Sequence, residues 1–154
     1  MSAEANKALM RRFVEFINSA SAPLAAELIA PDAIFHVPGQ PEPLGGPEGY
    51  LALLGMMRGG FPDLQWTLED VVAEPEHVAA RYTMRGTHRG TFFGVPPTGR
   101  PITVQSMAFY RIAGGQFIEE HGLPDMLGLM QQIGAVPGTV RPNAPPAFDT
   151  VTHR

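Results

Sequence analysis

The chain has 154 residues, a formal net charge of −4 at pH 7 and no cysteine. This length corresponds to one domain, and the apolar fraction of 44% is enough for a core. Without cysteine, neither a disulfide framework nor a thiolate metal site can form. The weak negative charge argues against nucleic-acid binding, and the apolar runs are too short to cross a bilayer. The first residues lack a signal-peptide pattern. We therefore expect a cytoplasmic protein with no nucleic-acid or membrane partner.

The first sixty residues predict three helices and one short strand. Apolar residues at helical spacing predict a helix from Ser2 to Ser19, and these residues are Leu9, Phe13, Phe16 and Ile17. A short second helix is predicted over 24–30, because Pro23 is tolerated in a first turn. Residues 33–37 fit a short strand, and a third helix is predicted from Pro47 to the glycine pair 59–60.

The apolar period changes from helical to two residues after position 63, which predicts strands. Strands are expected over 64–72, 78–85, 102–112 and 115–123, with a Gly- and Pro-rich excursion over 86–101. A short helix follows at 126–133. Helices followed by an antiparallel meander indicate an α+β fold. The predicted domain spans 1–135, and the aperiodic residues 136–154 are expected to form an irregular tail.

The end of the last predicted strand carries a candidate acid/base group. By the two-residue period, one face of this strand is expected to hold Phe117, Glu119, His121 and Leu123. Pro124 ends the strand, and Asp125 stands where the last helix starts. Two interpretations stay open for Asp125: it caps the helix, or it is a buried carboxylate that moves protons.

Most common catalytic and metal-binding signatures are missing from the sequence. The histidines show no i, i+4 spacing, so no metal site is predicted, although three of them could converge in space; they are His36, His77, His88, His121 and His153. The chain has neither a Gly-x-Ser-x-Gly nucleophile motif nor a phosphate-binding P-loop. Acid/base chemistry remains, with a structural role as the alternative for each histidine.

Several sequence motifs, and the order in which they occur, resemble those of a known protein family. The chain from about residue 7 to 135 is similar to the SnoaL-like polyketide cyclases, a branch of the nuclear-transport-factor-like, ketosteroid-isomerase-like superfamily. The motifs that carry the resemblance are Phe61-Pro-Asp63, Gly86-Thr-His-Arg-Gly90, Gly94-Val-Pro-Pro-Thr-Gly99, Phe117-Ile-Glu-Glu-His-Gly-Leu-Pro-Asp125 and Leu127-Gly-Leu-Met-Gln-Gln-Ile-Gly134.

The resemblance implies a cone-shaped α+β barrel, in which three N-terminal helices cover a strongly curved antiparallel sheet around one deep pocket. It also implies ring closure of a polyketide ester by intramolecular aldol condensation, without metal or cofactor. Asp125 matches the family's acid/base position, and His36 and His88 match frequent pocket positions. His121 stands where many relatives carry Trp.

We therefore expect a cofactor-independent cyclase or isomerase for a small hydrophobic carbonyl compound. The expected catalytic residues are Asp125, His121 and His88, and the expected substrate-binding residues are His36, Gln105, Trp66, Tyr50, Phe13, Met57 and Glu119. Two alternatives stay open: a hydrolase or hydroxylase on the same pocket, and a ligand-binding module without chemistry. A homodimer is expected through apolar sheet residues, with Trp66, Val71 and the strand 102–112 as candidates.

Overall fold

A computed structural model describes residues 2–137 of the chain. The N-terminal part forms α1 (Ala3–Ser19), α2 (Ala22–Leu28), β1 (Ile29–His36), β2 (Leu44–Gly45) and α3 (Gly46–Gly60). The rest forms β3 (Gln65–Ala73), β4 (His77–Thr87), β5 (Pro101–Ala113), β6 (Gln116–Pro124) and α4 (Met126–Gln132). The predicted tail at 136–154 lies outside the described residues from position 138 onward. No helix of the described part is long and apolar enough to cross a membrane.

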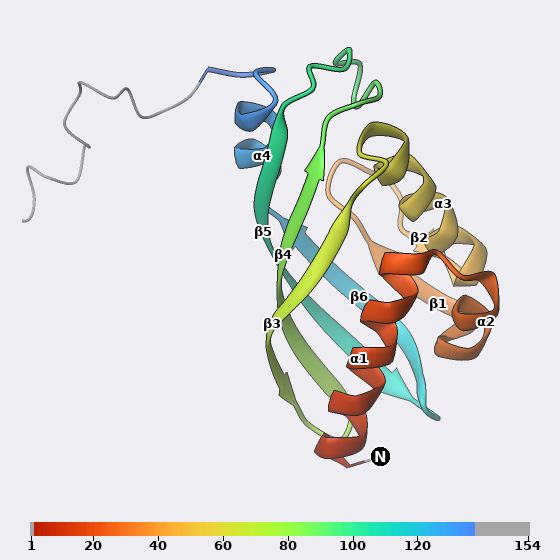
Figure 1. Cartoon of the computed structure of the whole chain (residues 1–154). Helices are drawn as coiled ribbons and strands as arrows, with labels where there is room; N and C mark the ends of the chain where they lie inside the picture. The colour runs from red at the N-terminus through yellow and green to blue at the C-terminus, as the bar shows by residue number, and fades with distance from the viewer. Residues whose placement is uncertain (1, 138–154) are drawn as a thin grey trace, which may run out of the picture.

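The strands form one strongly curved sheet in the order β2-β1-β6-β5-β4-β3. Helices α1, α2 and α3 cover one side of this sheet, and α4 lies against β5 (Figure 1). The predicted α+β class and cone-like curvature are confirmed. The sheet is mixed rather than purely antiparallel, because β1 runs parallel to β6 while the pairs β3–β4, β4–β5 and β5–β6 are antiparallel.

An aromatic cluster joins the helices to the inner face of the sheet. Phe13 of α1 is fully buried, and its ring contacts Tyr50 of α3 at 5.3 Å, Tyr110 of β5 at 5.4 Å and Phe117 of β6 at 4.6 Å between centroids. Aromatic pairs at such separations stabilise beyond their buried area. This cluster fixes α1 and α3 over β5 and β6, which positions everything that faces inward from those strands.

A β-bulge in β6 reverses the inward and outward faces of that strand. Ile112 pairs with Phe117, but the preceding residue Arg111 pairs with Glu119, so Ile118 is an extra residue. One inserted residue moves all following side chains to the opposite face. The expectation that Phe117, Glu119, His121 and Leu123 share one face is therefore wrong. Phe117 points inward, whereas after the bulge the inward residues are Glu120, Gly122 and Pro124.

The Gly- and Pro-rich connection between β4 and β5 is held by His88. Its ring is fully buried, and Nδ1 accepts a hydrogen bond from the Thr98 backbone N–H at 3.2 Å and lies 2.9 Å from Thr98 Oγ1. The backbone also closes the loop, because His88 N–H donates to Arg100 C=O and Gly99 N–H donates to His88 C=O. The connection then passes so close to the end of α3 that Gly90 N–H donates to Gly60 C=O.

This close approach leaves no room for a side chain at Gly90. We therefore predict that substitutions at Gly90 and Gly55 change the free energy of unfolding in opposite directions. A Cβ at position 90 would overlap the backbone carbonyl of Gly59, which cannot move without distorting the end of α3. We expect Gly90→Ala to destabilise the fold by about 2 kcal/mol or more, as other steric changes in well-packed positions do. Gly55→Ala is the control, because it lies in α3 with open space around it and should be stabilising by about 0.5–1 kcal/mol.

Thermal and urea unfolding of both variants provides the measurement. Equal stability of Gly90→Ala and the unmodified chain would show that the loop does not approach α3 as described.

Candidate active site

A partly open cavity of about 90 Å³ lies between the inner face of the sheet and the helices. Its walls are mostly apolar and come from α1, α3, β3, β4, β5, β6 and the segment after β1. Four of the predicted substrate-binding residues line it: His36, Tyr50, Met57 and Trp66. A mostly apolar cavity with few converging polar groups is the usual form of a small-molecule site.

The cavity contains a buried carboxyl group, that of Glu120 on β6. Only 6% of Glu120 is exposed, and the Tyr50 hydroxyl donates to its Oε1 at 3.0 Å. Burial raises the pKa of Glu120 to about 7, although hydrogen bonds from Tyr50 and Tyr110 act in the opposite direction. Desolvation disfavours the charged form of a carboxyl group, which explains the direction of this pKa shift. Near neutral pH, Glu120 therefore exchanges readily between acid and base.

The second oxygen of Glu120, Oε2, occupies the space that a side chain at position 122 would take, and this residue is Gly122. Gly122 is the next inward residue on β6 and also lines the cavity. A Cβ at position 122 would come within 2.9 Å of Glu120 Oε2. Glycine at this position therefore leaves room for the carboxyl group to lean along the strand, with Oε1 bonded to Tyr50 and Oε2 next to the cavity wall.

Two further tyrosines place hydroxyl groups in the same cavity. The hydroxyls of Tyr82 on β4 and Tyr110 on β5 lie 2.7 Å apart, and both side chains line the cavity. Burial is the largest cause that raises the pKa of Tyr50, Tyr82 and Tyr110 above its ordinary value, and the charge of Glu120 raises it further. These hydroxyls therefore stay protonated, and they can donate hydrogen bonds to a developing oxyanion.

Asp125, the predicted acid/base residue, lies at the rim of the cavity. It is the N-cap of α4, and its Oδ1 accepts the Gly128 backbone N–H at 2.9 Å. The side chain is exposed, but its two neighbours, Pro124 and Met126, line the cavity. The capping interpretation of Asp125 thus describes its contacts in the structure, and its catalytic role stays a prediction.

Three other predicted site residues lie away from the cavity wall. His88 is buried in the loop between β4 and β5. Gln105 points to the outer face of β5, where it contacts Arg81 and Thr83. Phe13 lies behind the wall and contacts the ring of Tyr50. These three side chains do not line the cavity, and their catalytic or binding roles stay predictions.

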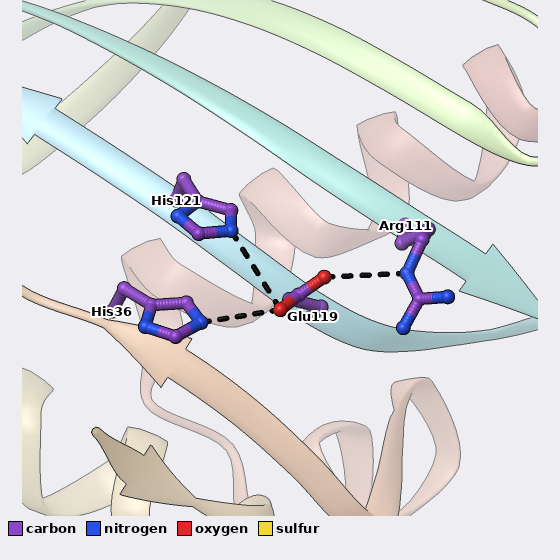
Figure 2. Close-up of polar contacts among 4 residues, drawn as sticks. All are labelled: His36, Arg111, Glu119 and His121. Atoms are coloured by element: carbon purple, nitrogen blue, oxygen red, sulfur yellow. Dashed lines mark hydrogen bonds and ion pairs between the residues drawn. The ribbon is translucent and has the colours of Figure 1, made fainter.

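The remaining predicted residues, Glu119 and His121, face the outer side of the sheet together with His36. Glu119 Oε2 lies 3.1 Å from His36 Nε2 and 3.6 Å from His121 Nε2, and the two imidazole rings stack at 4.1 Å (Figure 2). Arg111 donates to the other oxygen of Glu119 at 3.2 Å. The hydrogen bond from His36 is the largest cause that lowers the pKa of Glu119, and the charges of Arg111 and both histidines add to it.

Sequence reasoning missed Glu120, Tyr82 and Tyr110. Strict alternation from Phe117 assigned Glu120 to the outer face, and the tyrosines were not assigned to the site. One signal could have corrected this: a strand that offers Glu-Glu next to an apolar cavity can place either carboxyl inside, because a single bulge exchanges them.

The cavity, its buried carboxyl group and the curved sheet under three helices define a class of small α+β proteins that enclose a small-molecule site. Within that class, the family model "SnoaL-like polyketide cyclase" matches residues 7–133. The chain therefore belongs to the SnoaL-like polyketide cyclase family, as the motifs predicted. Its membership agrees with the expectation of an enzyme.

The chain is similar to named cyclases from Streptomyces and to a solved structure from that genus. The chain is 31% identical to aklanonic acid methyl ester cyclase DauD of Streptomyces sp. (strain C5) over 90% of this chain and 89% of that protein. It is 31% identical to nogalonic acid methyl ester cyclase of Streptomyces nogalater over 58% and 67%, respectively. The crystal structure of wild-type IdmH from Streptomyces antibioticus superimposes with a TM-score of 0.74 at 34% identity, covering 83% of this chain and 97% of that one.

The burial of Glu120 predicts an unusual pH dependence of stability. Its pKa is raised from an ordinary 4.5 to about 7 in the folded chain. A raised carboxyl pKa contributes stability that is fully present below the unfolded pKa and is lost as pH rises through the folded pKa. The free energy of unfolding of the unmodified chain minus that of Glu120→Gln should therefore fall by about 3 kcal/mol between pH 4.5 and 7.5.

Urea unfolding of both proteins across this pH range tests the prediction. Glu119→Gln is the matched control one residue away: the pKa of Glu119 is lowered from 4.5, so its contribution is present throughout this pH range and is lost only as pH falls further, and its difference from the unmodified chain should stay nearly constant here. A difference between the unmodified chain and Glu120→Gln that does not change with pH would contradict a buried, titrating Glu120.

Proposed function

We propose that the chain closes a ring of a polyketide methyl ester by intramolecular aldol condensation in the inner cavity, with Glu120 as the group that moves the proton. The observation that carries this proposal is a titratable carboxyl group in an apolar cavity, surrounded by three tyrosine hydroxyls. The names of the relatives, aklanonic and nogalonic acid methyl ester cyclases, support the substrate class.

The reaction needs one proton to be removed and one to be returned. In the carboxylate form, Glu120 takes a proton from the carbon next to a substrate carbonyl, and the resulting enolate carbon attacks a second carbonyl of the same molecule. The new carbon–carbon bond leaves an alkoxide, which takes the proton back from Glu120 and becomes a hydroxyl group. A pKa of about 7 suits both steps, because a catalytic group works best when its pKa is near the operating pH.

Tyrosine hydroxyls provide electrostatic stabilisation for the negative oxygen. Tyr82 and Tyr110 donate within a water-poor cavity, where such hydrogen bonds are stronger than in bulk water. The apolar walls hold the chain of the substrate folded, so that its two reacting carbons meet, and such orientation supplies much of the rate of an intramolecular reaction.

The cavity must widen to admit a polyketide, because about 90 Å³ holds only part of a ring system. Its wall contains methionines that can change rotamer without loss of a hydrogen bond, and Met56, Met57 and Met126 are the ones nearest the ends of α3 and β6. Asp125 lies next to Met126, so the carboxyl group that the family resemblance marks stands beside one of these methionines.

Paired substitutions decide which carboxyl group moves the proton. We expect Glu120→Gln to lower turnover of an aromatic polyketide methyl ester by about 10²–10⁴-fold, because loss of a general base has that effect. Asp125→Asn should leave turnover within a few-fold, because Asn serves as an N-cap as well as Asp. Substrate binding, followed by fluorescence titration, should survive in both variants.

The opposite result would reassign the reaction. If Asp125→Asn loses turnover and Glu120→Gln keeps it, the proton is moved at the rim and our assignment of Glu120 is wrong. If the unmodified chain binds the ester but never converts it, the alternative of a ligand-binding module replaces the cyclase.

We also propose that the chain forms a homodimer through the outer face of the sheet. Large apolar side chains from β3, β5 and β6 are half or more exposed there: Val72 (69%), Met107 (60%), Phe109 (50%) and Leu123 (71%). Apolar patches of this kind usually mark an interface. Trp66 and Val71, expected from the sequence as candidates for the dimer surface, are not part of the proposed surface. Trp66 lines the inner cavity and Val71 packs against the core.

Light scattering after size-exclusion chromatography tests the dimer. We expect a dimer at micromolar concentration and a shift to monomer in Met107→Lys, since a buried unpaired charge is costly at an interface. Leu127→Lys is the control, because Leu127 is equally exposed at 60% but lies on α4. A monomer in the unmodified chain would contradict the proposal.

A further inference from the structure

The parallel pairing of β1 with β6 brings three metal-ligating side chains together on the outer face. His36 is the register partner of His121, and Ile34 is the register partner of Glu119. Glu119 and His121 are two residues apart on one strand, so their side chains leave the same face. His36 comes from a distant part of the chain and meets them only because the two strands pair.

We propose that His36, Glu119 and His121 bind a divalent transition-metal ion with the preferences of Zn²⁺. One ligand atom from each residue lies within 4.8 Å of the others. In a tetrahedral site with metal–ligand distances of about 2.0–2.1 Å, ligand atoms are about 3.3 Å apart. The two measured separations from Glu119 Oε2, 3.1 Å to His36 Nε2 and 3.6 Å to His121 Nε2, bracket that value.

The side chains can complete the geometry with small movements. Both Nε2 atoms already point to the same carboxylate oxygen (Figure 2). The rings are nearly parallel, with an interplanar angle of 7°, so one ring must turn for both nitrogens to face a common ion. His121 can turn, because 59% of its side chain is exposed.

Arg111 orients the carboxylate and limits the strength of the site. Its Nε donates to Glu119 Oε1 at 3.2 Å, which leaves Oε2 for the ion. A hydrogen-bonded ligand is the normal arrangement around a metal site. The guanidinium charge also repels a cation, so a site of moderate affinity is expected, in which imidazole and carboxylate favour Zn²⁺ over softer ions.

The position of the three ligands on the outer face leaves the proposed ion open to solvent and to one further ligand. In the single chain, His36 and His121 line an open hollow on the outer face; Met107, Phe109 and Leu123 of the proposed dimer surface line the same hollow, so a dimer would border the cluster. Three protein ligands in a tetrahedral ion leave one position for water or a small anion, which is the arrangement of zinc sites that bind further ligands. The inference does not depend on the cyclase reaction, because Glu120 and the outer cluster lie on opposite faces of β6.

Isothermal titration of the full chain with ZnCl₂ is the primary experiment. We expect one ion per chain, a rise in melting temperature on Zn²⁺ addition, and a visible absorption spectrum of a four-coordinate ion when Co²⁺ is used instead. His121→Gln and Glu119→Gln should each lose the saturable binding and the Co²⁺ spectrum. Circular dichroism confirms that each variant is folded.

Matched controls separate this site from other histidines. His77→Gln removes a histidine outside the cluster, and this variant should bind Zn²⁺ like the unmodified chain. Arg111→Gln should bind more tightly, because it keeps a hydrogen-bond donor and removes the repelling charge. Light scattering with and without Zn²⁺ should show the same mass.

Three results would overturn the proposal: no saturable binding by the unmodified chain, unchanged binding in His121→Gln and Glu119→Gln, or binding that occurs only with a doubling of mass. The first would leave the cluster as a set of polar contacts without an ion. The second would place the ion elsewhere, and the third would require ligands from a second copy.

Discussion

The single extra residue at Ile118 determines what each face of β6 presents. Before the bulge, Phe117 points into the aromatic core, and after it the inward position passes to Glu120. Since side chains alternate along a strand, Glu119 and His121 are at the same time turned outward. Alternation places the two adjacent carboxyl groups on opposite faces of the sheet, and the bulge decides that Glu120 enters the buried tyrosine cluster while Glu119 lies beside two histidines.

Burying Glu120 destabilises its charged form, and the protein retains it in an otherwise apolar core. Desolvation is the largest cause of its raised pKa, and hydrogen bonds from tyrosines offset only part of it. Substituting a buried polar network by apolar residues is often neutral or stabilising in other proteins. The desolvation of the Glu120 carboxylate lowers stability, so its presence in the core indicates a functional role. The proposed proton transfer is such a role.

The fold was largely predictable from the sequence, and the site was predictable only in part. Helical spacing, Pro and Gly marked α1, α3, the four long strands and the turns between them, because these signals are local. Tyr50, Met57, Trp66 and His36, expected from the sequence to bind substrate, line the cavity, and their binding role stays a prediction. The only signal of the bulge is the Glu119-Glu120 pair, which does not say which carboxyl group points inward, so alternation from Phe117 placed Glu119 inside. The parallel pairing of β1 with β6 is a contact between distant segments, so the meeting of His36 with His121 could not be derived either.

His36 links the two faces of the molecule. It lines the inner cavity and also contacts Glu119 on the outer face, because it stands at the end of β1, where the strand gives way to the segment 37–40. Val37 and Pro38 line both the inner cavity and the outer hollow. The contact with Glu119, or a cation bound there, would hold the His36 ring in place. Because His36 lines the inner cavity, the same interaction holds part of the inner wall. The outer cluster thus positions part of the wall of the inner cavity without contributing a group to the proton transfer proposed there.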